Sequence, residues 1–157
     1  MQKNIFIAHA DGLYNEQTFY TKFLKDLDLC SREVIIESPY ITIERMETFS
    51  QVFQRLLHKK IKIQIITRDP SEHETVFYRD QATNEILKLS EMGVQLTLLH
   101  GYHHRKIAVL DRKVLWEGSL NILSQSKSLE FMRRLEEQRE VKATIKFLNY
   151  SSIISTF

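Results

Sequence analysis

Residues 101–121, GYHHRKIAVLDRKVLWEGSLN, are the most informative stretch of this chain. His104 and Lys106 lie two residues apart, Asp111 follows after four further residues, and Gly-Ser-x-Asn occupies 118–121. The residues around Lys106 predict a strand, on which His104 and Lys106 share one face because successive side chains alternate. A histidine beside a fixed positive charge suits attack on a phosphate, whose negative oxygens otherwise repel a nucleophile.

The residues after Asp111 predict a tight turn and a second strand over 114–117. Gly118 and Ser119 then open a loop. Backbone N–H groups in such a loop, together with the Asn121 amide, are suited to hold further phosphate oxygens. The whole stretch therefore predicts a strand hairpin that presents a phosphate-binding site.

This pattern, HxK(x)4D(x)6GSxN, resembles the signature of the phospholipase D superfamily at every specified position. The residues around it, including Ser128-Leu129-Glu130, resemble the nuclease-like branch of that superfamily. The resemblance extends over residues 5–135. It implies a phospholipase D-like fold and a phosphodiesterase that needs no metal and no cofactor.

The resemblance also implies roles for individual residues. His104 would attack phosphorus and form a covalent phosphohistidine. Lys106 and Asn121 would bind the non-bridging oxygens with the help of Ser119. Glu130 is the best candidate for orienting His104 through its other ring nitrogen, as carboxylates do for catalytic histidines elsewhere. The alternative for Glu130 is a surface position in a Ser-x-x-Glu turn.

Enzymes of this superfamily normally pair two copies of the motif, and the second histidine protonates the leaving oxygen. This chain contains one copy, so the resemblance implies a homodimer whose two motifs face each other across a two-fold axis. Asp111, at the far end of the predicted strand, is interpreted as a structural or hydrogen-bonding residue near that axis rather than a proton donor.

Composition is that of one globular domain. The 157 residues are 43% hydrophobic and 27% charged, and a net charge of +2 permits nucleic-acid binding without demanding it. Cys30 is the single cysteine, which excludes an internal disulfide and favours a reducing, cytoplasmic setting. The sequence lacks the run of about 18 apolar residues that a membrane span needs. We predict a single domain over 1–157, with its core at 4–135 and a helix and tail over 137–157.

Hydrophobic periodicity predicts an alternation of strands and helices. Strand–helix–strand units repeat, which favours an α/β fold with a mixed, largely parallel central sheet and helices on both faces. Asn15 is predicted to cap the first helix. The predicted strands are 4–9, 33–38, 61–67, 94–99 and 129–135, and the predicted helices are 15–30, 42–58, 79–92 and 137–149.

Two segments that directly follow strands, 38–40 and 67–70, are expected to border one cleft, because ligands in such sheets bind beyond the carboxyl ends of the strands. Arg68 is a candidate for contact with a phosphodiester backbone, and a solvated charge at a strand end is the alternative. Tyr40 either stacks on a base or caps the core, and the core is favoured.

Further basic residues and histidines have competing interpretations. Arg133 and Arg134 are candidates for a substrate channel because they follow Glu130 closely. His100 and His103 cluster with His104, but the sequence offers no fourth ligand at a spacing that suits zinc, so no metal site is predicted. His103 is expected to face away from His104.

Three functions compete. The leading hypothesis is a nuclease that cleaves DNA or RNA. The second is a lipid phosphodiesterase or phosphatidyl-transferase, although such enzymes generally carry two motifs in a longer chain. The third is a non-catalytic nucleic-acid-binding or dimerisation domain of a larger DNA-processing protein, with a helicase, ATPase or specificity domain as partner.

Overall fold

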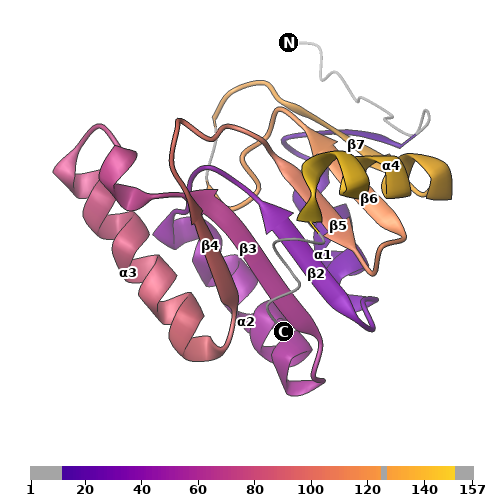
Figure 1. Cartoon of the computed structure of the whole chain (residues 1–157), viewed down its shortest axis with the longest axis horizontal. Coiled ribbons are helices and arrows are strands. Elements are labelled where there is room, and N and C mark those ends of the chain that lie inside the picture. Colours follow the sequence, from indigo (N-terminus) through magenta and orange to yellow (C-terminus); the bar gives the residue numbers. More distant parts are fainter. Residues whose placement is uncertain (1–11, 125–126, 151–157) are drawn as a thin grey trace, which may run out of the picture.

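A computed structural model describes residues 12–124 and 127–150. Within them the chain forms one seven-stranded sheet in the order β1-β7-β6-β5-β2-β3-β4 (Figure 1). The strands are β1 (Leu13–Asn15), β2 (Glu33–Glu37), β3 (Lys62–Arg68), β4 (Gln95–Leu99), β5 (Ile107–Leu110), β6 (Val114–Gly118) and β7 (Phe131–Leu135). The expected strand at 4–9 and the end of the predicted tail lie outside the described residues.

The mixed α/β fold class is confirmed, but the sheet is less parallel than the strand–helix–strand pattern suggested. Only β2–β3 and β3–β4 pair in parallel among the described strands, while β5–β6, β6–β7, β1–β7 and β2–β5 are antiparallel. Short turns force antiparallel pairing, whereas parallel pairing needs a long crossover. Because the motif hairpin attaches to the free edge of β2, half of the sheet is an antiparallel meander.

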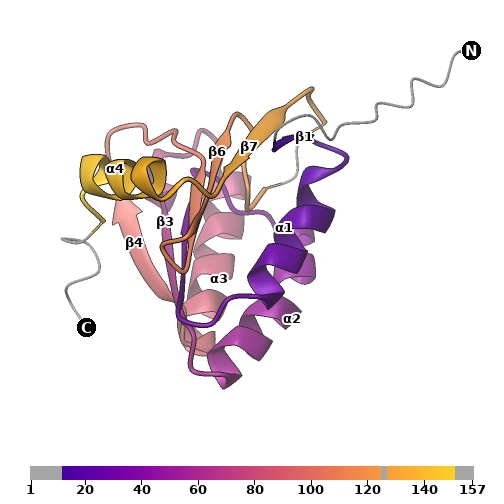
Figure 2. The same ribbon diagram turned by 90° about the vertical axis from the view of Figure 1, so that its right-hand side faces the viewer.

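Helices cover both faces of the sheet, as predicted. α1 (Phe19–Asp28), α2 (Ile43–His58) and α3 (Val76–Met92) lie on one face and α4 (Gln138–Leu148) lies on the other (Figure 2). α3 is preceded by a short 3-10 helix (Pro70–Glu72) and is capped by Gly93, whose φ of 105° is the left-handed conformation that glycine tolerates. Each face has its own hydrophobic core.

The predicted apolar stripes form the larger core. Phe19 and Phe23 of α1 are fully buried, as are Phe49 and Phe53 of α2. Trp116 of β6 is also fully buried, and its ring packs edge-on against Phe19 at 5.1 Å. The interpretation of these aromatic residues as core rather than as a ligand platform is confirmed.

The start of α1 differs from the prediction. The helix begins at Phe19 with Thr18 as the N-cap residue, not with Asn15. Asn15 ends β1, and its side-chain oxygen accepts hydrogen bonds from the backbone N–H groups of Gln17 and Thr18 at 3.0 and 3.1 Å. Asparagine readily forms such turns, and here the turn lies before the helix.

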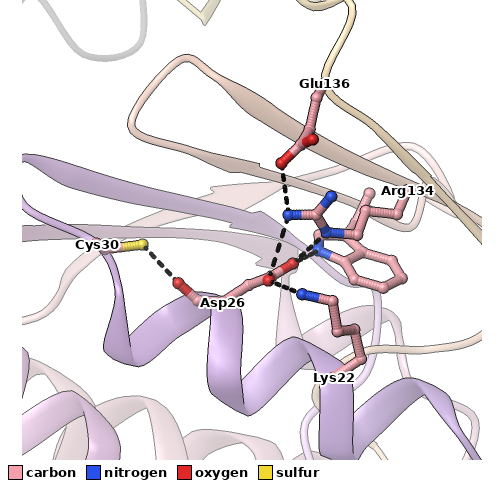
Figure 3. Close-up of polar contacts among 6 residues, drawn as sticks. Lys22, Asp26, Cys30, Arg134 and Glu136 are labelled. Carbon is pink, nitrogen blue, oxygen red and sulfur yellow. Dashed lines mark hydrogen bonds and ion pairs between the residues drawn. The ribbon is translucent and has the colours of Figure 1, made fainter. Parts of the chain in front are cut away.

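A buried carboxylate joins α1 to the antiparallel half of the sheet (Figure 3). Asp26 accepts hydrogen bonds from the Nε of Arg134 at 2.6 Å, from Trp116 Nε1 at 3.0 Å and from Lys22 Nζ at 2.5 Å. Burial raises the pKa of Asp26, but the hydrogen bonds and charges of Arg134 and Lys22 outweigh burial and hold this pKa below its usual value.

Candidate active site

His104 and Lys106 lie together in the extended segment that leads into β5. β5 begins at Ile107, later than the predicted strand start. Lys106 Nζ lies 2.9 Å from His104 Nδ1 and donates a hydrogen bond to the His104 carbonyl oxygen at 2.6 Å. The side chain of His104 is exposed, whereas that of Lys106 is buried. The structure thus brings the two residues together as the spacing predicted.

The charges around this pair favour the neutral form of His104. The Lys106 ammonium is the main cause of the lowered pKa of His104, and burial and the Arg68 guanidinium lower it further. Burial also lowers the pKa of Lys106, against the opposing charge of Glu130. A neutral imidazole keeps a free lone pair on one ring nitrogen, so His104 is suited to nucleophilic attack at neutral pH.

A pocket of about 580 Å³ opens beside this pair. Ser119, Phe131 and Arg133 line it together with His104 and Lys106. Arg133 is exposed there, as a substrate-channel residue would be. The pocket therefore joins the two ends of the motif hairpin to the start of β7.

Arg134 does not share this position, and the structure contradicts its predicted place in a substrate channel. Neighbouring residues of a strand face opposite sides of the sheet, so Arg133 and Arg134 diverge. Arg134 points toward α1, where it pairs with Asp26 (Figure 3). Its guanidinium is held in an ion pair inside the domain.

The Glu130 carboxylate is held between two hydroxyl groups. The Ser119 hydroxyl donates a hydrogen bond to one carboxylate oxygen, and the Ser128 hydroxyl donates to the other at 2.6 Å. The backbone N–H of Phe131 donates to the Ser119 oxygen at 3.1 Å. Glu130 is thus fixed beside Ser119 at the pocket, while the ring nitrogens of His104 lie against Lys106.

Arg68 is buried, which contradicts the alternative of a solvated charge. Its Nε and Nη2 donate to the carbonyl oxygen of His103 at 3.2 and 2.8 Å, and its Nη1 donates to the Tyr40 hydroxyl at 3.1 Å. Arg68 therefore fixes the backbone next to His104. Its charge lowers the pKa of both His104 and Lys106, which places it within electrostatic range of the reaction centre.

Asp111 lies at the opposite end of β5 from Lys106. Its carboxylate accepts hydrogen bonds from the backbone N–H groups of Ser31, Arg32 and Glu33 at 2.8, 2.8 and 3.0 Å. These bonds fix the start of β2 against the β5–β6 turn. Its geometry is that of a structural, hydrogen-bonding residue, and it is not among the residues that line the pocket beside His104 and Lys106.

Asn121 faces a second pocket, of about 210 Å³, and is not among the residues that line the larger one. Its carbonyl oxygen accepts a hydrogen bond from the Tyr20 hydroxyl at 3.2 Å. Its side-chain Oδ1 is buried and has no hydrogen-bond partner among the described residues. Buried polar atoms without a partner are uncommon in folded proteins, so this amide is a candidate ligand-binding group.

Sequence reasoning missed a buried network behind the motif. Glu37, at the end of β2, is fully buried and accepts hydrogen bonds from Arg105 Nε at 2.6 Å and from the Tyr150 hydroxyl at 2.5 Å, with His103 Nε2 at 2.7 Å. Burial raises the pKa of Glu37, but these hydrogen bonds lower it below its usual value. The sequence signal for this network was Glu37, a charged residue directly after the apolar run Val34-Ile35-Ile36.

Tyr150→Phe is expected to lower the free energy of unfolding by about 1.5–3 kcal/mol, because a hydrogen bond to a buried charged group is lost while the ring remains. Urea denaturation measures the change. Tyr102→Phe is the control, since Tyr102 is 79% exposed and should change nothing. Equal midpoints for the two variants would contradict the importance of this network.

Among residues 12–124 and 127–150, no cluster of three or more His, Cys, Asp or Glu side chains is placed to hold a metal ion. The helices in the same ranges are too short or too polar to cross a lipid bilayer.

Solved structures of similar fold include three proteins of low sequence identity to this chain. NucT from Helicobacter pylori matches with a TM-score of 0.69 and 18% identity, over 88% of this chain and 92% of that chain. Nuc from Salmonella typhimurium, described as a phospholipase D family member, matches with a TM-score of 0.67 and 12% identity, over 86% and 88%. TrmBL2, described as an archaeal chromatin protein with a novel mode of DNA binding, matches with a TM-score of 0.58 and 10% identity, over 93% of this chain and 54% of that chain.

A search of curated protein sequences found no match. The model of the family described as "Cardiolipin synthase, PLD-like domain" matches residues 23–148, which include the whole motif hairpin and the four described helices apart from the first turn of α1. The motif and the fold agree with this match. The chain therefore belongs to the phospholipase D-like domain family.

Proposed function

We propose that this protein is a phosphodiesterase that cleaves nucleic acid, DNA or RNA, through a covalent phosphohistidine and without a metal ion. The contact between His104 and Lys106 at the mouth of the larger pocket carries the proposal. A neutral nucleophile beside a fixed cation is the arrangement that attack on a phosphodiester needs. The likeness of the fold to Nuc, described as a phospholipase D family member, supports a phosphodiester substrate, and the likeness to TrmBL2, described as binding DNA, supports a nucleic acid.

In the proposed reaction a ring nitrogen of His104 attacks phosphorus, and the bond from phosphorus to the leaving oxygen breaks. Lys106 and Asn121 hold the non-bridging oxygens, and Ser119 positions the Glu130 carboxylate, whose proposed role is to orient His104. A second histidine protonates the leaving oxygen. That histidine then activates water, which hydrolyses the phosphorus–nitrogen bond and restores His104.

The second histidine is proposed to be His104 of another copy of the chain. Leu129 and Phe131 support this proposal, because they are 92% and 52% exposed next to the site, and Phe131 lines its pocket. An exposed apolar cluster beside an incomplete site suits an isologous contact, in which the same surface of two copies meets across a two-fold axis.

The double variant Leu129→Asp, Phe131→Asp is expected to weaken dimerisation at least about 30-fold, because two apolar anchors become charged. Analytical ultracentrifugation and cleavage assays on the same samples should show dimer and activity lost together. Leu29→Asp is the matched control, since Leu29 is 79% exposed after α1. A monomeric double variant that keeps full activity would contradict the shared site.

The test of the proposed function is cleavage of labelled single- and double-stranded DNA and RNA in excess EDTA. The wild type should cleave at least one of them, and His104→Ala should not. His100→Ala is the control, because His100 is an exposed histidine of the neighbouring loop. Cleavage that needs a metal ion, or that survives in His104→Ala, would contradict the proposal.

A non-catalytic DNA-binding or dimerisation role is the second candidate, because a chromatin protein has a similar fold. The complete set of His104, Lys106 and Asn121 favours catalysis, since a scaffold has no physical need for it. A fused or separate helicase, ATPase or specificity partner and a cytoplasmic location stay predictions, as does the less favoured activity on lipid phosphodiesters.

A further inference from the structure

The smaller pocket, of about 210 Å³, is built mainly from aromatic rings and polar groups. Tyr40 follows β2, His73 follows the 3-10 helix after β3, and Tyr78 lies in the first turn of α3. Asn121 and Ser124, from the loop after β6, complete the polar side of the wall. The pocket therefore lies beyond the carboxyl ends of the two central parallel strands, where α/β sheets bind ligands.

Arg68 and the segment after β6 connect this pocket to the reaction centre. Arg68 donates to the Tyr40 hydroxyl on one side and to the His103 carbonyl oxygen on the other, directly before His104. Asn121 lines the smaller pocket and stands two residues after Ser119, which lines the larger one. The smaller pocket is thus linked to the backbone before His104 and to the loop that carries Ser119.

Polar atoms of the pocket residues lack partners. His73 is 4% exposed, and its Nδ1 has no hydrogen-bond partner in the described part of the chain. The same is true of Asn121 Oδ1. Burial and the Arg68 charge lower the pKa of His73, so its ring is neutral and offers one N–H donor and one acceptor. These groups match a ligand edge that carries both donors and acceptors.

The aromatic rings of the pocket have different surroundings. Tyr40 stacks on His73 at 5.2 Å with 26° between the rings, and the Arg68 guanidinium lies 4.9 Å from the Tyr40 ring centre. Tyr40 is therefore a fixed wall. Tyr78 is 53% exposed and meets Phe77 edge-on, so its ring is the one open to a ligand.

We propose that the smaller pocket receives one unstacked nucleobase of the strand whose neighbouring phosphodiester lies at His104. Tyr78 supplies the stacking face, and His73 Nδ1 and Asn121 Oδ1 supply the hydrogen-bonding edge. The Asn121 NH2 group remains the donor for the phosphate oxygen. This inference rests on the proposed nuclease function and narrows its substrate. A base that is paired and stacked in a duplex cannot enter the pocket, so the site selects single-stranded nucleic acid or unpaired segments.

The experiment measures binding of fluorescent single-stranded oligonucleotides by anisotropy, with the full chain carrying His104→Ala so that the strand stays intact. A series of oligonucleotides places one abasic residue at each position in turn. Adding Tyr78→Ala should weaken binding of the ordinary oligonucleotide about tenfold, since one base–aromatic stack is lost. The two proteins should bind alike when the abasic residue occupies the contacted position, because the stack is then absent in both.

Two further variants make the test specific. Phe77→Ala removes the neighbouring exposed ring, which does not line the pocket, and should leave binding unchanged. His73→Phe keeps a ring against Tyr40 but removes the polar edge. It should weaken binding of the ordinary oligonucleotide but not of the oligonucleotide whose abasic residue occupies the contacted position.

Several results would overturn the base pocket. These are unchanged binding in Tyr78→Ala, an equal loss for every abasic oligonucleotide, no binding of any oligonucleotide, or an equal effect of Phe77→Ala. The last would show that the exposed rings of the first turn of α3 contact nucleic acid as an open surface, without a base pocket. Failure of the proposed function would look different. In that case the His104→Ala protein binds oligonucleotides with the predicted dependence on Tyr78, but the wild type does not cleave them.

Discussion

Lys106→Met is expected to reduce kcat for phosphodiester cleavage by about 10²–10³-fold, the usual cost of removing one group that stabilises transition-state charge. Methionine keeps most of the length and volume of the buried side chain, so the loss reports on charge. Lys106 Nζ lies within 2.9 Å of the His104 ring and is therefore placed to meet a phosphate under attack.

The same substitution should move the acidic limb of the pH–rate profile to higher pH. The Lys106 charge is the main cause of the lowered pKa of His104, so removing that charge raises this pKa. Activity needs neutral His104 as the nucleophile and appears as pH rises through its pKa. In Lys106→Met that rise should therefore occur at higher pH. NMR titration of the His104 ring measures the same pKa without turnover.

Lys113→Met is the control for both effects. Lys113 is an exposed lysine in the turn at the other end of β5, so its replacement removes an equal charge far from the pocket. Its kcat and pH profile should match the wild type. An unchanged acidic limb in Lys106→Met would contradict the proposed effect of the Lys106 charge on the pKa of His104.

Asp26→Ala is expected to lower the free energy of unfolding by about 3–5 kcal/mol. The substitution leaves the Arg134 guanidinium, whose side chain is 16% exposed, and the buried Trp116 N–H without their acceptor. Chemical denaturation followed by Trp116 fluorescence measures the loss. Because Asp26 joins α1 to β6 and β7, the variant should also unfold with reduced cooperativity.

Asp28→Ala is the matched control in the same helix. Its ion pair with Arg55 is half exposed on both sides, and such pairs contribute about 0–1 kcal/mol. The contribution of Asp26 should also depend on pH, because its pKa is lowered in the folded state. It is fully present above the unfolded pKa of about 3.9 and is lost as pH falls through the folded value. A similar loss in Asp26→Ala and Asp28→Ala would contradict the structural role of Asp26.

Much of the fold could be predicted from hydrophobic periodicity, because burial of one face of each helix or strand imposes that periodicity. Strands and helices over 33–99 were predicted to within a few residues, since each apolar stripe or run meets the core of one sheet face. The pairing direction of the motif hairpin was harder to predict. Which edge of β2 it joins depends on contacts between distant residues, such as the hydrogen bonds that Asp111 accepts from backbone N–H groups at and just before the start of β2.

The candidate site was likewise predictable only where it depends on local spacing. Spacing alone placed His104 beside Lys106, because both lie in one extended segment. The different positions of Arg133 and Arg134 were not predicted. Because β7 places successive side chains on opposite faces of the sheet, Arg133 lines the pocket and Arg134 pairs with Asp26. Glu37 could not be connected to His103 from the sequence, since 66 residues separate them.

The measurement that tests the central claim most directly is mass spectrometry of the protein after rapid acid-free quenching during turnover of a short oligonucleotide. The account predicts a phosphoryl-linked adduct on the peptide that contains His104, stable in base and lost in acid, and absent in His104→Ala. An adduct on another residue, or steady turnover in which no protein-bound phosphate accumulates in the wild type or in a variant slowed at the hydrolysis step, would contradict it.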